Sequence, residues 1–353
     1  MSYGLFVELL RVSLGLQTEL SVEPSLEEWK SLYSIAMKHT LMGVVFSGIE
    51  RLPQLQRPPQ SVLSKWIATV IHTEQANRHL NAKIKELAEI CSNNGLESCL
   101  LKGQGVARLY PNPLRRQCGD VDLWIRGKRN ATIDAFRNIS PLTEICNHHA
   151  HCDIFPDAVV EIHFLPCWMY SPVTNKRLQR FFHDSEDRQF NNFNVDLGVN
   201  VTDISFDLVF SAVHIYRHLF TEGIGLRQLL DYYYILSHST AQQREEAYHV
   251  LTSLRMGGFA SAMMHVLGKM FSMSKEFMYV LPDEKVGEFL LSEIMQAGNF
   301  GKYDSRITWR KKGLLSVFVY KIRRNLRFLR YFPSEVLWSP FWKVWHFIWR
   351  KLR

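Results

Sequence analysis

Residues 100–126 read LLKGQGVARLYPNPLRRQCGDVDLWIR, and this stretch contains the strongest indications of fold and function in the chain. Near the end of this stretch, acidic and apolar residues alternate from Gly119 to Ile125. Alternate side chains of a β-strand point to the same face, so Asp120 and Asp122 share one face and their apolar neighbours share the other. Two adjacent carboxylates repel each other unless a cation lies between them, and Mg²⁺ prefers oxygen ligands while also binding phosphates. The stretch therefore predicts a strand that carries a divalent-metal site.

The beginning of the same stretch predicts a binding site for an anion. Residues 100–105 indicate a short apolar strand, a tight glycine turn that carries Lys102, and the start of a helix. Backbone N–H groups at such a turn, and at the first turn of a helix, are well placed to bind a phosphate.

The combination of these features resembles the nucleotidyltransferases of the DNA polymerase β-like superfamily. More narrowly, it is similar to the bacterial family described as uncharacterised nucleotidyltransferases. The superfamily pattern is an apolar strand, a glycine turn, two carboxylates one residue apart, and a third carboxylate on a later strand. The narrower family has Lys-Gly in the turn, a Leu-Tyr-Pro helix end, and an arginine four residues before the first aspartate. The matching residues are Lys102-Gly103, Leu109-Tyr110-Pro111, Arg116, Asp120, Asp122 and Glu161.

The resemblance implies transfer of an NMP group from an NTP to an acceptor hydroxyl, with release of pyrophosphate. Two Mg²⁺ ions are expected, because cations about 3.5–4 Å apart can hold the attacking and the leaving oxygens together. Asp120 and Asp122 would bridge both ions. Glu161 would hold the ion beside the acceptor oxygen or act as its base. The expected donor is ATP, although neither the base nor the acceptor can be read from these residues.

The resemblance also implies how the nucleotide is held. Lys102 would contact the nucleotide phosphates, and Gly103 would allow the backbone to approach them closely. Arg116 would steady the phosphates or brace the acidic strand. The alternative for Lys102 and Arg116 is that they only screen the acidic pair.

Residues 146–153, CNHHAHCD, are a second cluster that could carry chemistry. Their Cys and His residues invite a zinc interpretation, but they lack the paired spacing of a structural zinc site. The family has a histidine on the strand before its third carboxylate, and either His149 or His151 could match it. His163 follows Glu161 by two residues and resembles the family's Glu-x-His. It is interpreted as a contact on the acceptor side or as a structural histidine.

Two further pairs lie at helical spacing in the C-terminal half. His214 and His218 are four residues apart, as are Arg227 and Asp231, and we expect the latter two to pair. No glutamate lies between the histidines, so a zinc-protease motif is excluded. These helices also resemble the narrower family. They would close over the nucleotide or acceptor, or simply form a polar bridge between helices.

The expected strands and helices, together with the resemblance, imply an α+β fold, with a small mixed β-sheet nucleotidyltransferase core flanked by N- and C-terminal helical domains. The 353 residues, 46% of them hydrophobic, suffice for two or three domains with substantial cores. Ser25 to Glu28 predicts a capping box, and Asp203 or Ser205 a second helix cap. Strands are expected near 97–101, 120–125, 142–154 and 158–164, and helices near 104–110 and 128–138. The expected domains are an N-terminal helical domain (1–95), the core (96–200), a second helical domain (201–301) and a basic, Trp-rich tail (302–353).

The tail is the most basic part of the chain. Residues 302–353 contain 14 Lys or Arg residues and two acidic ones, whereas the whole chain has a net charge of +8. We expect a basic helix over 310–330, followed by a segment with Trp338, Trp342, Trp345 and Trp349. This composition suits an anionic membrane surface. RNA or another polyanion is a weaker alternative, and packing against the preceding helices is a third.

Two other functions remain open at this stage. One is a degenerate protein that binds nucleotides without turnover, and the other is an interaction protein that works through its basic tail. The six cysteines lack CxxC pairs and are interpreted as reduced thiols. With no apparent secretory signal or membrane-spanning stretch, we expect a cytoplasmic protein that can associate peripherally with the inner face of the membrane.

Overall fold

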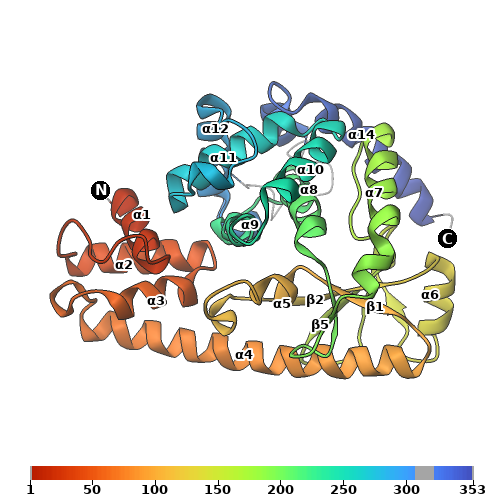
Figure 1. The fold of residues 1–353 in the computed structure, drawn as a ribbon, viewed down its shortest axis with the longest axis horizontal. Helices are drawn as coiled ribbons and strands as arrows, with labels where there is room; N and C mark the ends of the chain where they lie inside the picture. Colours follow the sequence, from red (N-terminus) through yellow and green to blue (C-terminus); the bar gives the residue numbers. More distant parts are fainter. Residues whose placement is uncertain (1, 307–321, 352–353) are drawn as a thin grey trace.

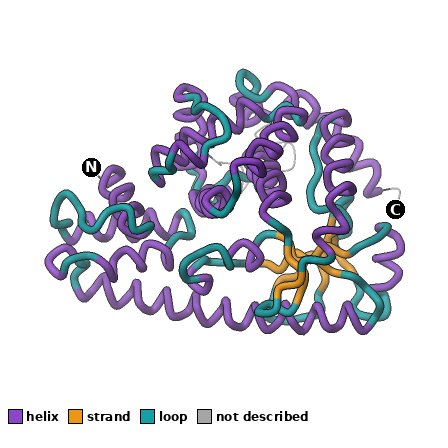
Figure 2. Tube along the Cα trace, viewed as in Figure 1, coloured by secondary structure: helices purple, strands orange, loops and turns teal. Residues whose placement is uncertain are grey.

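The computed structural model describes residues 2–306 and 322–351. It shows a mixed seven-stranded sheet with helices before and after it in the chain, which confirms the predicted α+β class. Figure 1 shows one very long helix, α4 (Gln60–Asn93), running beneath the sheet, while the C-terminal helices lie above it. Figure 2 shows that the strands are confined to the region between these two helical layers.

Four helices form the N-terminal part, α1 (Ser2–Ser13), α2 (Leu26–Lys38), α3 (Met42–Arg51) and α4, with a 3-10 turn η1 (Gln54–Gln56). The capping box at the start of α2 is confirmed, because Ser25 and Glu28 each bind the backbone N–H of the other. Trp66, near the start of α4, packs edge-on against Trp29 and Tyr33 of α2. This buried aromatic group fixes the first half of α4 against the other helices, while the second half continues under the sheet.

The sheet has the strand order β3-β4-β5-β2-β1-β7-β6. Its central strand β2 is antiparallel to β1 and parallel to β5, which in turn is antiparallel to β4. The strand bounds are β1 (Ser98–Leu101), β2 (Asp120–Ile125), β3 (Leu142–Thr143), β4 (His149–Cys152), β5 (Val159–His163), β6 (Phe193–Asn194) and β7 (Val199–Val201).

The single strand expected over 142–154 is wrong. Glu144 has a positive φ of 45°, which extended backbone does not allow. The Cys146 N–H then donates to the carbonyl of His149, so the chain turns before it resumes as β4. The expected helices are correct in kind but shorter, as α5 (Gly103–Ala107) and α6 (Arg129–Phe136), and a 3-10 turn η2 (Pro113–Arg115) precedes β2.

The alternation within β2 separates the two faces of the sheet. Val121, Leu123 and Ile125 are buried against the C-terminal half of α4 and against Phe136 of α6. This apolar contact is the reason that the alternate residues, Asp120 and Asp122, face away from α4.

The C-terminal helices cover the face that carries the two aspartates. Asp203 is one of the two residues predicted to cap a helix here. It caps α8 (Ile204–Thr221) by accepting a hydrogen bond of 2.8 Å from the Phe206 N–H. Residues 322–328 are also helical, whereas the remainder of the helix expected over 310–330 lies outside the described residues. The other helices are α7 (Pro172–Phe190), α8 (Ile204–Thr221), α9 (Leu226–Ser237), α10 (Ala241–Ser253), α11 (Gly257–Phe271), α12 (Glu284–Ala297) and α14 (Pro333–Lys351), with 3-10 turns η3 (Lys275–Phe277) and η4 (Asn299–Gly301).

One apolar core cluster contains residues from Leu5 in α1 to Val336 in α14, and a second lies between the sheet and α4. The predicted domain boundaries stay a prediction. No helix within the described ranges is both long enough and apolar enough to cross a membrane.

Candidate functional site

Strands β2 and β5 form the floor of the candidate site. Their parallel register places Asp122 beside Glu161 and Trp124 beside His163. Strand β4 continues the same rows, with His151 opposite Glu161 and His149 opposite His163. Two carboxylates and three histidines therefore lie on one face of three adjacent strands, although they are distant in sequence.

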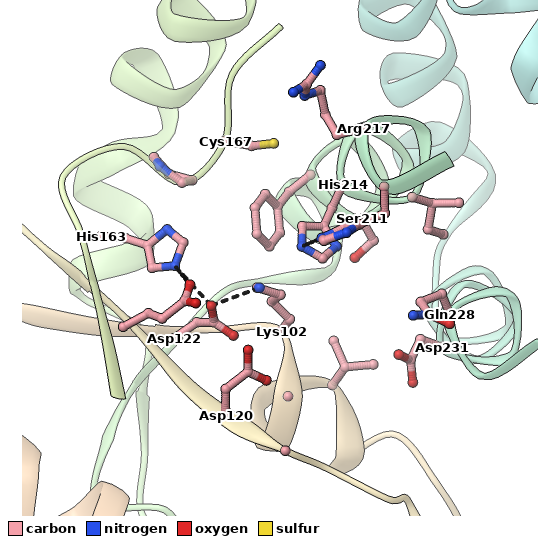
Figure 3. A pocket seen from close by; sticks show the side chains of 18 of the residues that line it. Lys102, Asp120, Asp122, His163, Cys167, Ser211, His214, Arg217, Gln228 and Asp231 are labelled. Atoms are coloured by element: carbon pink, nitrogen blue, oxygen red, sulfur yellow. Dashed lines mark hydrogen bonds and ion pairs between the residues drawn. The ribbon is translucent and has the colours of Figure 1, made fainter. Parts of the chain in front are cut away.

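Lys102 and His163 both contact the same carboxylate oxygen. Lys102 Nζ lies 2.8 Å from Oδ1 of Asp122, and His163 Nε2 lies 2.9 Å from it. His163 Nε2 is also 3.4 Å from Oε2 of Glu161. Figure 3 shows this cluster, with Asp120 pointing into the same pocket from the start of β2.

The turn that carries Lys102 has an unusual backbone. Lys102 has φ 42° and ψ −142°, and Gly103 follows with φ 46°. A side chain in this conformation costs about 1–3 kcal/mol, and such strain is typical of functional sites. The strained turn allows Lys102 to reach across the end of β1 to Asp122, which pairs with Leu101 in the sheet.

Electrostatics keep the cluster charged despite its burial. Burial opposes ionisation of Asp122, but Lys102 and His163 hold the pKa of this carboxyl below its ordinary value. Burial likewise opposes ionisation of Glu161, yet its contact with His163 lowers its pKa to about 2. For His163, hydrogen bonds to the two carboxylates outweigh burial and raise the pKa to about 9. The carboxylates similarly overcome burial to raise the pKa of Lys102. At neutral pH the site therefore holds ionised carboxylates with two cations against them.

The cluster lies at the bottom of a pocket of about 440 Å³ between the sheet and helices α8 and α9. A volume of this size is typical of small-molecule sites. Of the residues predicted from the sequence, His151 alone is not part of the lining, and it faces a neighbouring pocket instead. The predicted residues that line the pocket are Lys102, Gly103, Arg116, Asp120, Asp122, His149, Glu161, His163, His214, His218, Arg227 and Asp231.

Arg116 forms a buried ion pair with Asp231 of α9. Its Nε and Nη2 atoms each lie 2.7 Å from a different oxygen of that carboxylate, and the Tyr110 hydroxyl donates to Oδ1 at 2.6 Å. The expected pairing of Arg227 with Asp231 is therefore wrong. Arg227 instead donates to the backbone carbonyl of Gln117.

The two histidines of α8 contact each other. Nε2 of His214 and Nε2 of His218 are 3.0 Å apart, so one ring donates and the other accepts. Burial lowers the pKa of His214 well below its ordinary value, with a contribution from the positive charge of Lys102. A neutral imidazole thus faces the pocket opposite the carboxylates.

The sequence did not reveal that Arg217 and Trp168 line the pocket. The Arg217 guanidinium lies 3.6 Å from the ring centre of Trp168 and 3.7 Å from that of Tyr170. Trp342 of α14 stacks on Trp168, with ring centres 3.7 Å apart. Arg217 lies three residues after His214 and so on the same helical face, which was the available signal. No local signal could have shown that the tail supplies Trp342.

The residues present fit a divalent cation. Asp122 and Glu161 provide the hard oxygen ligands that Mg²⁺ prefers, and together with His163 they have ligand atoms within 4.8 Å of one another. His163 would have to release its proton before its Nε2 could bind a metal. His149, His151 and Glu161 form a second such group that shares Glu161. Asp120 belongs to neither group, although it lines the same pocket.

Asp122 and Glu161 on adjacent strands, the lysine-bearing turn and the pocket above them match the arrangement that the resemblance to nucleotidyltransferases implies. The chain belongs to one particular family of this class, since the family model described as "Uncharacterised nucleotidyltransferase" matches residues 25–272, more than half of the chain. A search of curated proteins found none that matches this chain. Membership of the family supports a general role in nucleotidyl transfer.

Proposed function

We propose that this protein is a Mg²⁺-dependent enzyme that transfers an NMP group from an NTP, with ATP as the first candidate, to an acceptor hydroxyl and releases pyrophosphate. The observation that carries the proposal is the arrangement of Asp122 and Glu161, side by side on β2 and β5 and ionised at neutral pH. Ionised carboxylate oxygens are the ligands that Mg²⁺ prefers.

The proposal assigns the metal ligands to the floor of the pocket. Asp120 and Asp122 would hold the ions that bind the nucleotide, and Glu161 would hold the ion nearest the acceptor or act as its base. Mg²⁺ at these carboxylates would neutralise the charge that develops on the phosphate oxygens. The imidazoles of His149 and His163 lie 3.7 and 3.4 Å from Oε2 of Glu161 and would fix its position on the acceptor side.

Cationic and neutral polar side chains would hold the rest of the nucleotide. Lys102 is the one ammonium group among the described residues that line the pocket, and it lies next to the carboxylates where the phosphates would bind. Arg227 and His218 line the opposite wall, from α9 and α8. Arg116 donates from Nε and Nη2 to the carboxylate of Asp231. We therefore assign Arg116 the role of bracing the acidic strand rather than a direct contact with the phosphates.

Thermal unfolding with each NTP tests the proposal. The melting temperature should rise with one NTP and Mg²⁺ together, because a ligand present at about 100 times its Kd adds about 2.7 kcal/mol of stability. The shift should be lost in the Asp120→Asn/Asp122→Asn variant. A matched control is Asp134→Asn/Asp184→Asn, which removes the same charge from exposed positions and should keep the shift.

Turnover distinguishes an enzyme from a protein that only binds nucleotides. Pyrophosphate release that requires Mg²⁺ and Asp122 would support the proposal. A Mg²⁺-dependent shift without pyrophosphate release, across sugar, small-alcohol, protein and RNA acceptors, would favour the degenerate nucleotide-binding protein instead. The absence of a shift with every NTP would refute the proposed donor site.

A further inference from the structure

Helix α14 exposes a continuous apolar face. The apolar residues of this face recur every three or four positions and therefore lie on one side of the helix. Each is between 42% and 69% exposed. They are Leu337, Trp338, Phe341, Val344, Trp345 and Ile348, which we call the outer face of α14. Single exposed apolar residues are ordinary, whereas a continuous set of large ones marks an interaction site.

The opposite side of α14 is fixed to the body of the protein. Glu335 is buried and accepts hydrogen bonds from the backbone N–H groups of Tyr170 and Ser171, at 2.7 and 3.2 Å. Trp342 stacks on Trp168 with an angle of 13° between the rings. Because these contacts set the rotation of the helix, the outer face cannot turn inward to bury its apolar side chains.

The outer face belongs to the basic segment 302–353, which presents positive charge to solvent. The two acidic residues of this segment, Asp304 and Glu335, are both buried. Asp304 is bound to Arg306, and Glu335 is bound to the backbone as described above. Exposed basic side chains include Lys302, Arg323 and Arg330. An apolar helix face on a segment whose exposed charges, among the described residues, are all basic is complementary to anionic lipid headgroups over a hydrocarbon layer.

We propose that the outer face of α14 binds the surface of an anionic membrane, with the helix lying in the plane of the headgroups. α14 is not a membrane-spanning helix, so its apolar side chains would enter the headgroup region from one side only. The same helix stacks Trp342 on Trp168, which lines the pocket, so binding through α14 would place the pocket near the lipid surface. The proposal does not depend on the proposed nucleotidyl transfer.

Vesicle flotation of the full chain tests the proposal. We expect the protein to float with vesicles of phosphatidylcholine mixed with phosphatidylglycerol, and much less with phosphatidylcholine alone, because of the basic groups. Phe341→Gln/Ile348→Gln should reduce binding about tenfold for each side chain removed from the lipid. Glutamine keeps the helix propensity, and the two positions are exposed, so the melting temperature should not change.

The matched control removes apolar side chains elsewhere on the surface. Val195→Gln/Leu281→Gln changes two residues that are 81% and 85% exposed and lie outside α14, and it should bind vesicles as the wild type does. Three outcomes would overturn the proposal. They are no flotation with either vesicle, equal flotation of the wild type and the α14 variant, and a dimer in light scattering that the α14 variant abolishes, since the outer face would then be covered by a second copy.

Discussion

The buried pair of Arg116 and Asp231 shows how a single residue connects two layers of the molecule. Arg116 precedes β2, whereas Asp231 lies in α9, above the sheet. Two parallel hydrogen bonds of 2.7 Å join them, and the Tyr110 hydroxyl completes the coordination of the carboxylate. Such a pair stabilises a fold weakly compared with apolar packing, but removal of one partner leaves an uncompensated buried charge.

We therefore predict that Asp231→Asn lowers the free energy of unfolding by about 3–5 kcal/mol. Tyr110→Phe removes one hydrogen bond to a buried carboxylate and should cost about 1.5–3 kcal/mol. Urea unfolding followed by circular dichroism measures both changes. The surface variant Arg126→Met, which breaks partly exposed pairs with Glu97 and Asp187, should cost less than about 1 kcal/mol. An Asp231→Asn variant as stable as the wild type would show that the pair serves ligand binding only.

A second residue-level prediction concerns pH. Asp207 of α8 is fully buried, and burial raises the pKa of its carboxyl to about 7 despite a hydrogen bond from Thr202 at 2.6 Å. Between the unfolded pKa of 3.8 and this folded value, the folded chain holds a proton that the unfolded chain has released. The contribution of Asp207 to stability therefore falls as the pH rises through this range.

Asp207→Asn removes that pH dependence. Its stability relative to the wild type should increase by about 3 kcal/mol between about pH 5 and about pH 8, at about 1.4 kcal/mol per pKa unit. Denaturant unfolding at the two pH values measures the difference, and the exposed Asp184→Asn is the control, with no such change. A constant difference between wild type and Asp207→Asn would contradict the raised pKa.

At the level of elements, the site depends on how closely helix α3 approaches the segment before β2. Gly43 lies in α3, and a Cβ atom there would be 2.2 Å from the backbone carbonyl oxygen of Arg115. The absence of a side chain at Gly43 thus permits α3 to pack directly against η2. The same segment continues into Arg116 and then into the acidic strand, so this contact supports the position of the site.

Gly43→Ala should lower the free energy of unfolding by about 1–3 kcal/mol, because backbone atoms must move to make room. Gly4→Ala in α1 is the matched control, since nothing lies within 4 Å of a Cβ atom at Gly4. That change should stabilise the protein slightly, by about 0.5–1 kcal/mol, through helix propensity. Equal effects of the two substitutions in thermal unfolding would mean that α3 and η2 are not in close contact in solution.

On the scale of the whole molecule, two helices that are far apart in the chain, α4 and α14, support the sheet and the pocket wall from opposite sides. Helix α4 closes the sheet from below, and α14 buttresses the pocket wall from above through the stack of Trp342 on Trp168. The tail is thus partly a structural component of the body, and its outer face is left for another partner. Both roles fall on one helix because its two sides carry different sets of aromatic residues.

Two tryptophans of α14 allow this division to be tested. Trp342→Ala should reduce the free energy of unfolding by about 2 kcal/mol or more, because a ring packed against Trp168 is lost. Trp338→Ala, on the outer face and 42% exposed, should cost less than about 0.5 kcal/mol. Chemical denaturation of the full chain measures both. Equal losses would mean that the tail does not pack on the body as described.

Local signals determined much of the fold and part of the site. The period-2 pattern of residues 120–125 predicted β2, because a strand with one buried face must alternate. The capping motifs at Ser25 and Asp203 identified helix starts, since a cap acts on the backbone within three residues. These features depend on interactions between near neighbours in the chain.

The tertiary structure alone decided which distant residues meet. The sequence placed Asp231 with Arg227, one helical turn away, but packing of α9 over the sheet brought Arg116 to it from 115 residues earlier. In the same way, strand register put His149 and His151 beside Glu161, and α14 brought Trp342 to Trp168. The sequence by itself therefore determined the acidic strand, the basic turn and the basic tail. Which cation neutralises each buried carboxylate was decided by packing, because a charge pairs with whichever opposite charge the folded chain brings within reach.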